Sequence, residues 1–230
     1  MSLSVDSRPC GTVYVLRCTG RIVTGEPISV LEGGFERGLR ESTRLVLDLA
    51  EVNRVDSTGM GLLVRFLSHA RNRGGDLRLS AAPPFVASLL QVTKLATVFR
   101  LYETEEQAIV SYLKGSAMVH PAAAAGRKVL FLDQSPDLCA FVRTLLQQHG
   151  YDVSSTCRMR DARLLLTADN FEFVVLGPDS SGLPSDNVVL SLKSLAPAAT
   201  TIQLHEDFKR EDAEHASRHL LRMMQGAAQS

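Results

Sequence analysis

Residues 45–63 read LVLDLAEVNRVDSTGMGLL, and no other stretch of the chain is as informative about its fold. It opens with the apolar run 45–49, which is typical of a short buried strand. After Asp56 and Ser57 the apolar residues recur at helical spacing, and this predicts an amphipathic helix that ends at the glycine pair 74–75. A buried strand that leads directly into a helix indicates α/β architecture.

The same alternation extends to both sides of this stretch. Residues 12–18 are rich in β-forming side chains, and we expect Gly20 to close that strand with a turn. The next apolar residues recur every three or four positions, which predicts a helix (Ile28, Leu31, Phe35 and Leu39). Downstream, strands are expected at 77–80 and 98–101 and helices at 84–93 and 105–114.

The pattern stops at residues 116–126, where small residues and one Pro show no apolar periodicity. Such a segment predicts a linker. A second alternation of strand and helix patterns follows it, with strands expected at 128–132, 151–154, 173–176 and 200–204 and helices at 137–149, 161–168, 187–195 and 210–224. We therefore predict two α/β domains, at 1–115 and 127–230, joined by the linker 116–126.

Composition narrows the class of protein. Lys plus Arg and Asp plus Glu number 25 each, so the basic surplus of a nucleic-acid binder is missing. The start of the chain lacks the features of a secretory signal, and no run approaches the roughly 18 apolar residues of a membrane span. The cysteines at 10, 18, 139 and 157 form no CxxC pair, so buried thiols or inert surface thiols are expected. We expect a cytoplasmic protein without metal, cofactor, nucleic acid or membrane partner.

Asp56 and Ser57 lie at the expected start of a helix, where free backbone N–H groups and the helix dipole favour anions. Two interpretations are open at this point. Either residue could simply cap the helix. Alternatively, Ser57 could be an exposed hydroxyl that a kinase modifies, in which case a phosphate would add about −1.5 to −2 charges and change the face offered to a partner.

From Gly20 to about Lys114 the chain resembles the STAS family of anti-sigma-factor antagonists. The resemblance depends on the segments 45–49, 56–63, 73–79, 89–90 and 93–99, which follow the family's order and spacing. It implies a mixed β-sheet with helices. It also implies that Ser57 is the phosphoacceptor, because the first of the two hydroxyl residues in the family's motif has that role.

The resemblance further implies a cycle of partner switching. The unmodified domain would bind an anti-sigma factor, often a serine kinase of the histidine-kinase-like ATPase type, and phosphorylation would break the complex until a phosphatase restores it. This chain would be the substrate and not an enzyme. The expected partner-binding residues are Asp56, Thr58, Gly59 and Met60, with the loop 21–24 nearby.

The second half more loosely resembles a response-regulator receiver, which has a flavodoxin-like parallel α/β fold, and it looks shortened at its end. The matching segments are 128–136, 148–153 and 171–176. Receiver chemistry needs an aspartate after the third strand, an acidic pair to hold Mg²⁺, and a hydroxyl. The corresponding positions lack most of these groups, so a degenerate site without phosphorylation is predicted (Asp133, Gln134, Gly177 and His205).

Two alternatives to the sigma-factor regulator stay open. The first is a structural scaffold in a larger sensory complex, with Ser57 tuning assembly. The second is an adaptor of histidine-kinase signalling, with the degenerate receiver docking a kinase. A monomer or homodimer favours the sigma-factor regulator, whereas a large homo-oligomer favours the scaffold.

Overall fold

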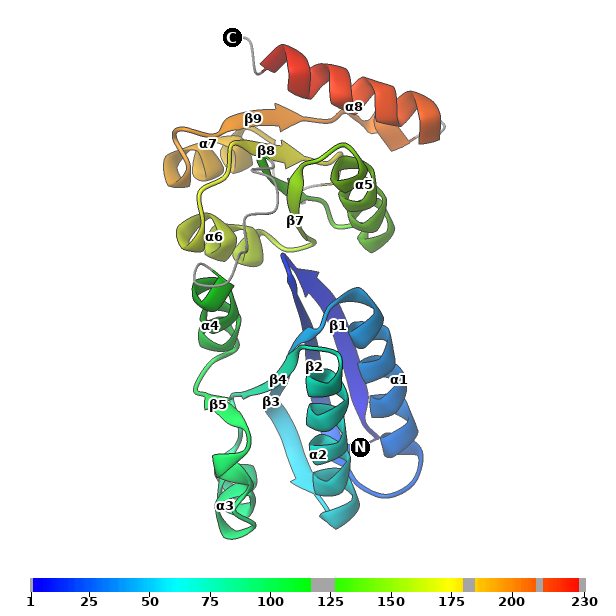
Figure 1. Cartoon of the computed structure of the whole chain (residues 1–230), viewed down its shortest axis with the longest axis vertical. Helices are drawn as coiled ribbons and strands as arrows, with labels where there is room; N and C mark the ends of the chain where they lie inside the picture. Colours follow the sequence, from blue (N-terminus) through cyan, green and yellow to red (C-terminus); the bar gives the residue numbers. More distant parts are fainter. Residues whose placement is uncertain (1, 117–126, 180–184, 210–212, 228–230) are drawn as a thin grey trace. The chain divides into compact units, whose positions relative to one another are not determined.

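The computed structural model describes residues 2–116, 127–179, 185–209 and 213–227. The chain divides into two compact units, Met1–Ala117 and Met118–Ser230, which are described separately (Figure 1). The predicted linker lies outside the described residues except for Ser116, so its bounds stay a prediction. None of the helices within the described ranges combines the length and the apolar character of a membrane span.

Unit 1 is a mixed sheet covered by helices. Its elements are β1 (Ser4–Cys10), β2 (Val13–Ile22), α1 (Glu26–Glu41), β3 (Arg44–Val55), α2 (Ser57–Asn72), β4 (Asp76–Ser80), α3 (Pro84–Val92), a 3-10 turn (Leu95–Thr97), β5 (Arg100–Tyr102) and α4 (Glu105–Ser116). The strand order is β5-β4-β3-β2-β1. The β1–β2 pair is antiparallel and the other pairs are parallel, so the predicted mixed sheet is confirmed.

Successive side chains along each strand of unit 1 point to opposite faces of the sheet. Leu45, Leu47 and Leu49 of β3 point to the face covered by α1 and α2. On that face Phe35 of α1 stacks on Phe66 of α2, with ring centroids 3.9 Å apart. The apolar periodicity that predicted the two helices is therefore the stripe that packs against the sheet.

The opposite face of the sheet packs against α4 through polar groups. Arg8 of β1 and Glu105 of α4 form a buried two-bonded ion pair, in which Nη2 and Oε1 are 2.5 Å apart. Arg17 adds a second contact to Glu105 at 3.2 Å. Arg78 of β4 lies over the ring of Tyr112, 3.4 Å from its centroid. Removal of either Arg8 or Glu105 would leave the other charge buried without its partner, so the packing of α4 on this face depends on both residues.

The structure corrects the sequence analysis at three places in unit 1. Strand β3 continues six residues past its predicted end at Leu49. Strand β1 was not predicted, because it is polar and contains Pro9, which is unusual inside a strand. The expected turn at Gly20 is wrong, because β2 continues through it to Ile22. Gly20 has φ +107° at an irregularity of the β2–β3 register, and a Cβ there would lie 2.4 Å from the backbone oxygen of Ser2. Only glycine fits that approach.

Unit 2 alternates strands and helices regularly. Its elements are β6 (Lys128–Leu132), α5 (Pro136–Gln148), β7 (Asp152–Thr156), α6 (Met159–Ala168), β8 (Phe173–Leu176), α7 (Ser185–Leu195), β9 (Thr200–Gln203), a 3-10 turn (Glu206–Lys209) and α8 (Ala213–Ala227). The strand order within the unit is β7-β6-β8-β9, and all three pairs are parallel. Each strand predicted in this half is confirmed to within two residues at either end.

The helices of unit 2 cover both faces of its sheet. Phe131 and Val175 point to a core shared with α5 and α8, to which Ala216, Leu220 and Met224 contribute at helical spacing. Their strand neighbours, Leu130 and Val174, are also fully buried and point to the opposite face, where α6 and α7 lie (Figure 1). Burial on both faces explains why these strands read as continuous apolar runs.

Candidate functional site

Ser57 lies at the carboxyl edge of the parallel strands of unit 1. Strand β3 ends at Val55 and α2 begins at Ser57, so the backbone turns from strand to helix within Asp56. The Asp56 N–H donates to the Ile22 carbonyl at 3.2 Å, which holds this turn against the end of β2. The start of α2 is thus fixed by the sheet itself.

Asp56 is the N-cap of α2. Its backbone is extended, and its Oδ1 accepts a hydrogen bond of 2.8 Å from the Gly59 N–H. Its Oδ2 accepts from the N–H and the hydroxyl of Thr24, at 2.8 and 3.0 Å. The Thr24 hydroxyl also lies 2.9 Å from that of Thr58. The sequence placed the loop 21–24 near the site, but Thr24 as a direct partner of Asp56 was missed, because the two residues are 32 positions apart.

Because Asp56 caps α2, the side chain of Ser57 is not needed as the cap. Ser57 is the first residue of α2 and is exposed, and Thr58 beside it is exposed as well. Of the two interpretations that the sequence left open, the helix cap falls to Asp56 alone. The phosphoacceptor role of Ser57 stays a prediction.

The other two predicted partner-binding residues are buried in the free domain. Met60 packs in the core of unit 1 with 7% of its surface exposed. Gly59 is buried against the end of β2, and a Cβ on it would lie 2.4 Å from the Ile22 carbonyl oxygen. Both therefore have a packing role here, and their part in binding a partner stays a prediction.

The capping bonds predict how Asp56 titrates. Hydrogen bonds from the Gly59 N–H and then from Thr24 hold the pKa of the Asp56 carboxyl below its usual value. A folded pKa below the unfolded one gives stability that is present above the unfolded pKa, about 3.9, and is lost as the pH falls through the folded pKa. We expect an NMR titration of the Asp56 carboxyl to have a midpoint below that of the same aspartate in a short peptide.

Thr24→Val is the matched control, because it removes the hydroxyl donor and keeps the Thr24 N–H. It should move the midpoint of Asp56 upward, towards the peptide value, while the fold is retained. A wild-type midpoint at or above the peptide value would contradict the capping role of Asp56.

The residues of the predicted degenerate receiver site follow the carboxyl ends of three parallel strands in unit 2. Asp133 comes directly after β6 and is completely buried, whereas Gln134 is exposed. Gly177 directly follows β8 and is buried, and His205 lies two residues beyond β9 and is exposed. Because the strands are parallel, all of these positions share one edge of the sheet.

The Asp133 carboxylate is used within the fold. Its Oδ1 accepts from the Ser135 N–H at 2.8 Å, and its Oδ2 accepts from the Asp179 N–H at 2.9 Å. A Cβ on Gly177 would lie 2.2 Å from that Oδ2. The space that an acceptor aspartate would need at position 177 is therefore filled by Asp133.

Comparison with known proteins adds the following. Residues 8–108 match the model of the STAS domain. Among solved structures, the chain is similar to an anti-sigma factor antagonist from Mycobacterium paratuberculosis, with 22% identity, coverage of 48% of this chain and 93% of the other, and a TM-score of 0.43. It is also similar to the Bacillus cell fate determinant SpoIIAA in its phosphorylated form, with 17% identity, coverage of 47% of this chain and 99% of the other, and a TM-score of 0.41. A sulfate transporter family protein from Wolinella succinogenes is similar with 21% identity, coverage of 47% of this chain and 89% of the other, and a TM-score of 0.41.

The family match lies within unit 1. Its bounds enclose the mixed sheet almost entirely, from Arg8 in β1 to Ala108 in α4, with Asp56 and Ser57 between them. Residues 8–108 of this chain form a STAS domain.

Proposed function

We propose that unit 1 is an anti-sigma-factor antagonist that phosphorylation of Ser57 switches off. Unmodified, it binds an anti-sigma factor that is also a serine kinase of the histidine-kinase-like ATPase type. Phosphorylated, it releases that partner until a phosphatase removes the phosphate. The observation that supports this most is the exposed Ser57 hydroxyl at the first position of α2, beside a cap that another residue supplies.

A phosphate on Ser57 would change the surface and leave the fold intact. It would add about −1.5 to −2 charges at a helix N-terminus, where the dipole tolerates an anion. The Asp56 carboxylate is already bound to Gly59 and Thr24, so the phosphate need not displace the cap. Two negative groups would then stand side by side on the face offered to the partner. Like charges brought together across an interface cost several kcal/mol.

The partner would contact the exposed residues around Ser57. On α2 these are Thr58, Gly61 and Arg65, and the loop after β2 contributes Thr24. Arg65 is paired with Glu32 of α1, so the exposed surface extends from α2 towards α1. The buried Gly59 and Met60 would act by setting the position of this turn.

For unit 2, the proposal is a degenerate receiver-like domain that docks or regulates and does not accept a phosphoryl group. The parallel order β7-β6-β8-β9 supports it, because it follows the first four strands of the flavodoxin-like order 2-1-3-4-5. The contact between Asp133 and Gly177 supports the loss of phosphorylation. A cytoplasmic location belongs to the same proposal.

The test is capture of partners from the native cell, with the full-length chain as bait and mass spectrometry as readout. Wild type and Ser57→Ala should retain a histidine-kinase-like ATPase, and Ser57→Asp should lose it by roughly 100-fold or more, since each 1.4 kcal/mol is a factor of ten. Ser68→Asp is the matched control. Ser68 is exposed on the same helix, eleven residues on, which places it about 20° round the axis and about 16 Å from Ser57.

Ser68→Asp should keep far more of the partner than Ser57→Asp, because it carries the same charge beyond Arg65, at the edge of the proposed contact. If all four baits recover the same proteins, Ser57 is not a switch. In that case the scaffold hypothesis leads, and it predicts a large homo-oligomer in solution.

A further inference from the structure

Two cysteines that are far apart in the sequence meet in unit 2. Cys139 is the fourth residue of α5, and Cys157 follows the last residue of β7. Their Sγ atoms are 3.7 Å apart, and Cys157 donates a hydrogen bond to Cys139. The Cys139 thiol also lies 3.3 Å from the Asp133 carbonyl oxygen and 3.6 Å from that of Thr156. The two thiols are therefore in direct contact, which their separation in the sequence did not indicate.

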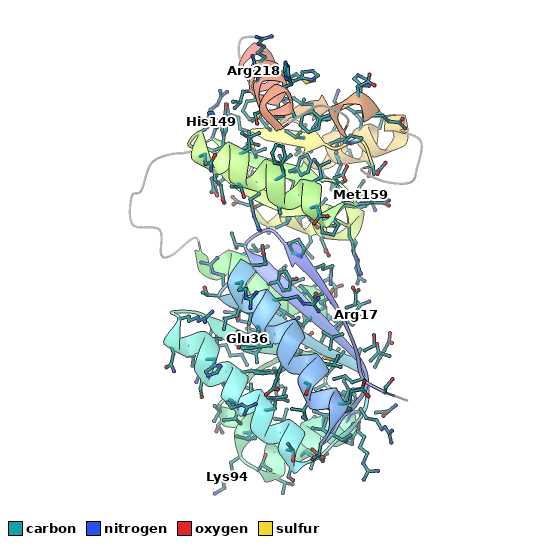
Figure 2. All side chains as sticks on the ribbon, turned by 90° about the vertical axis from the view of Figure 1, so that its right-hand side faces the viewer. Arg17, Glu36, Lys94, His149, Met159 and Arg218 are labelled. Atoms are coloured by element: carbon teal, nitrogen blue, oxygen red, sulfur yellow. The ribbon has the colours of Figure 1, made fainter. Side chains whose placement is uncertain are left out.

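The pair occupies the end of unit 2 at which α5 and α6 begin. In Figure 2, His149 marks the carboxyl end of α5, and Met159, the first residue of α6, lies towards its opposite end. Cys157 is in a bend and belongs to no helix or strand, so its sulfur can move without breaking backbone hydrogen bonds of an element. A disulfide would need the sulfurs to close from 3.7 Å to about 2.05 Å.

The two thiols differ in access and in acidity. Cys139 is 1% exposed, whereas Cys157 is partly exposed. The hydrogen bond shared with Cys139 lowers the pKa of the Cys157 thiol, although burial, Asp133 and Asp161 oppose its ionisation. The pKa of Cys139 is raised by its hydrogen bond with Cys157 and by burial. Since the thiolate is the reactive form, a small oxidant meets the more reactive sulfur first.

We infer that Cys157 and Cys139 form a redox modification site that takes a hydroperoxide such as H₂O₂. The Cys157 thiolate attacks one peroxide oxygen, the O–O bond breaks, and with one proton the products are a Cys157 sulfenic acid and water. The Cys139 thiol then attacks the Cys157 sulfur, and the hydroxyl leaves as water with the Cys139 proton. The S–S bond forms, the two thiols lose two electrons, and the peroxide is reduced.

The experiment oxidises the full-length, fully reduced protein with an equimolar amount of H₂O₂ and maps the product by mass spectrometry. We expect the chain to lose the mass of two hydrogen atoms, the peptides of Cys139 and Cys157 to be joined, and dithiothreitol to reverse the change. Cys139→Ser should accumulate a sulfenic acid on Cys157 that dimedone traps. Cys157→Ser should leave Cys139 unmodified, and Cys18→Ser, a buried thiol of unit 1, should react like wild type.

The result for the wild-type chain does not depend on whether any substituted chain folds, so disulfide mapping of the wild type is sufficient to decide the question. The inference is overturned if the wild-type thiols at 139 and 157 stay free under this treatment. It is also overturned if the disulfide joins other cysteines or links two chains. Dimedone labelling of Cys139 in place of Cys157 would contradict the assigned order of attack.

Discussion

Gly59→Ala is expected to destabilise unit 1 by about 3 kcal/mol, at the upper end of overpacking penalties. The added Cβ would lie 2.4 Å from the Ile22 carbonyl oxygen, and that oxygen belongs to the backbone of β2 and cannot rotate away. The same carbonyl accepts the Asp56 N–H, so relief of the clash must also move the turn that carries Ser57. The chain has no Trp, and hydrogen exchange of the β2 and β3 amides is the suitable measurement of unfolding.

Gly61→Ala is the matched control for this prediction. It lies on the same helix two residues away, and a Cβ there would meet nothing within 4 Å. Because alanine favours a helix over glycine, this change should stabilise unit 1 by about 0.5–1 kcal/mol. Equal effects of the two substitutions would show that helix propensity, and not contact with β2, decides the role of Gly59.

Gly177→Asp is expected to destabilise unit 2 and to gain no phosphoryl acceptance. Position 177 matches the acceptor position of a receiver, but a Cβ on it would lie 2.2 Å from Oδ2 and 2.6 Å from Cβ of the fully buried Asp133. We expect a loss of about 3 kcal/mol from the clash. Incubation with acetyl phosphate and Mg²⁺ should leave the variant unlabelled, and hydrogen exchange of the β6 and β8 amides should report the lower stability.

Asp133→Gly supplies the control in a double-mutant cycle. Alone it destabilises unit 2, because it removes the acceptor of the Ser135 and Asp179 N–H groups. Combined with Gly177→Asp it also removes the atoms that clash, so the double variant should lose less than the sum of the two single losses. Additive losses, or labelling of the Gly177→Asp chain, would contradict a site filled by Asp133.

The helices and the buried strands of both units could be predicted from apolar periodicity. The stripe of α1 and the runs of β3 and β8 are local patterns that report which side of each element is buried. Strand β1 could not be predicted, because its burial depends on pairing with β2, and its own residues are mostly polar. Gly20 indicated a turn because glycine does so on average, whereas here it allows a close backbone approach inside a strand.

The sequence by itself determined the elements other than β1, the division into two α/β halves and the placement of Asp56 and Ser57 at a helix start, because these depend on neighbours within a few residues. Only the tertiary structure decided which of those two residues caps the helix, since the second partner of Asp56 is Thr24 from another strand's loop. It likewise decided that Asp133 fills the space beside Gly177 and that Cys139 meets Cys157. Contacts between distant residues depend on how the strands pair, and local patterns carry no record of that pairing.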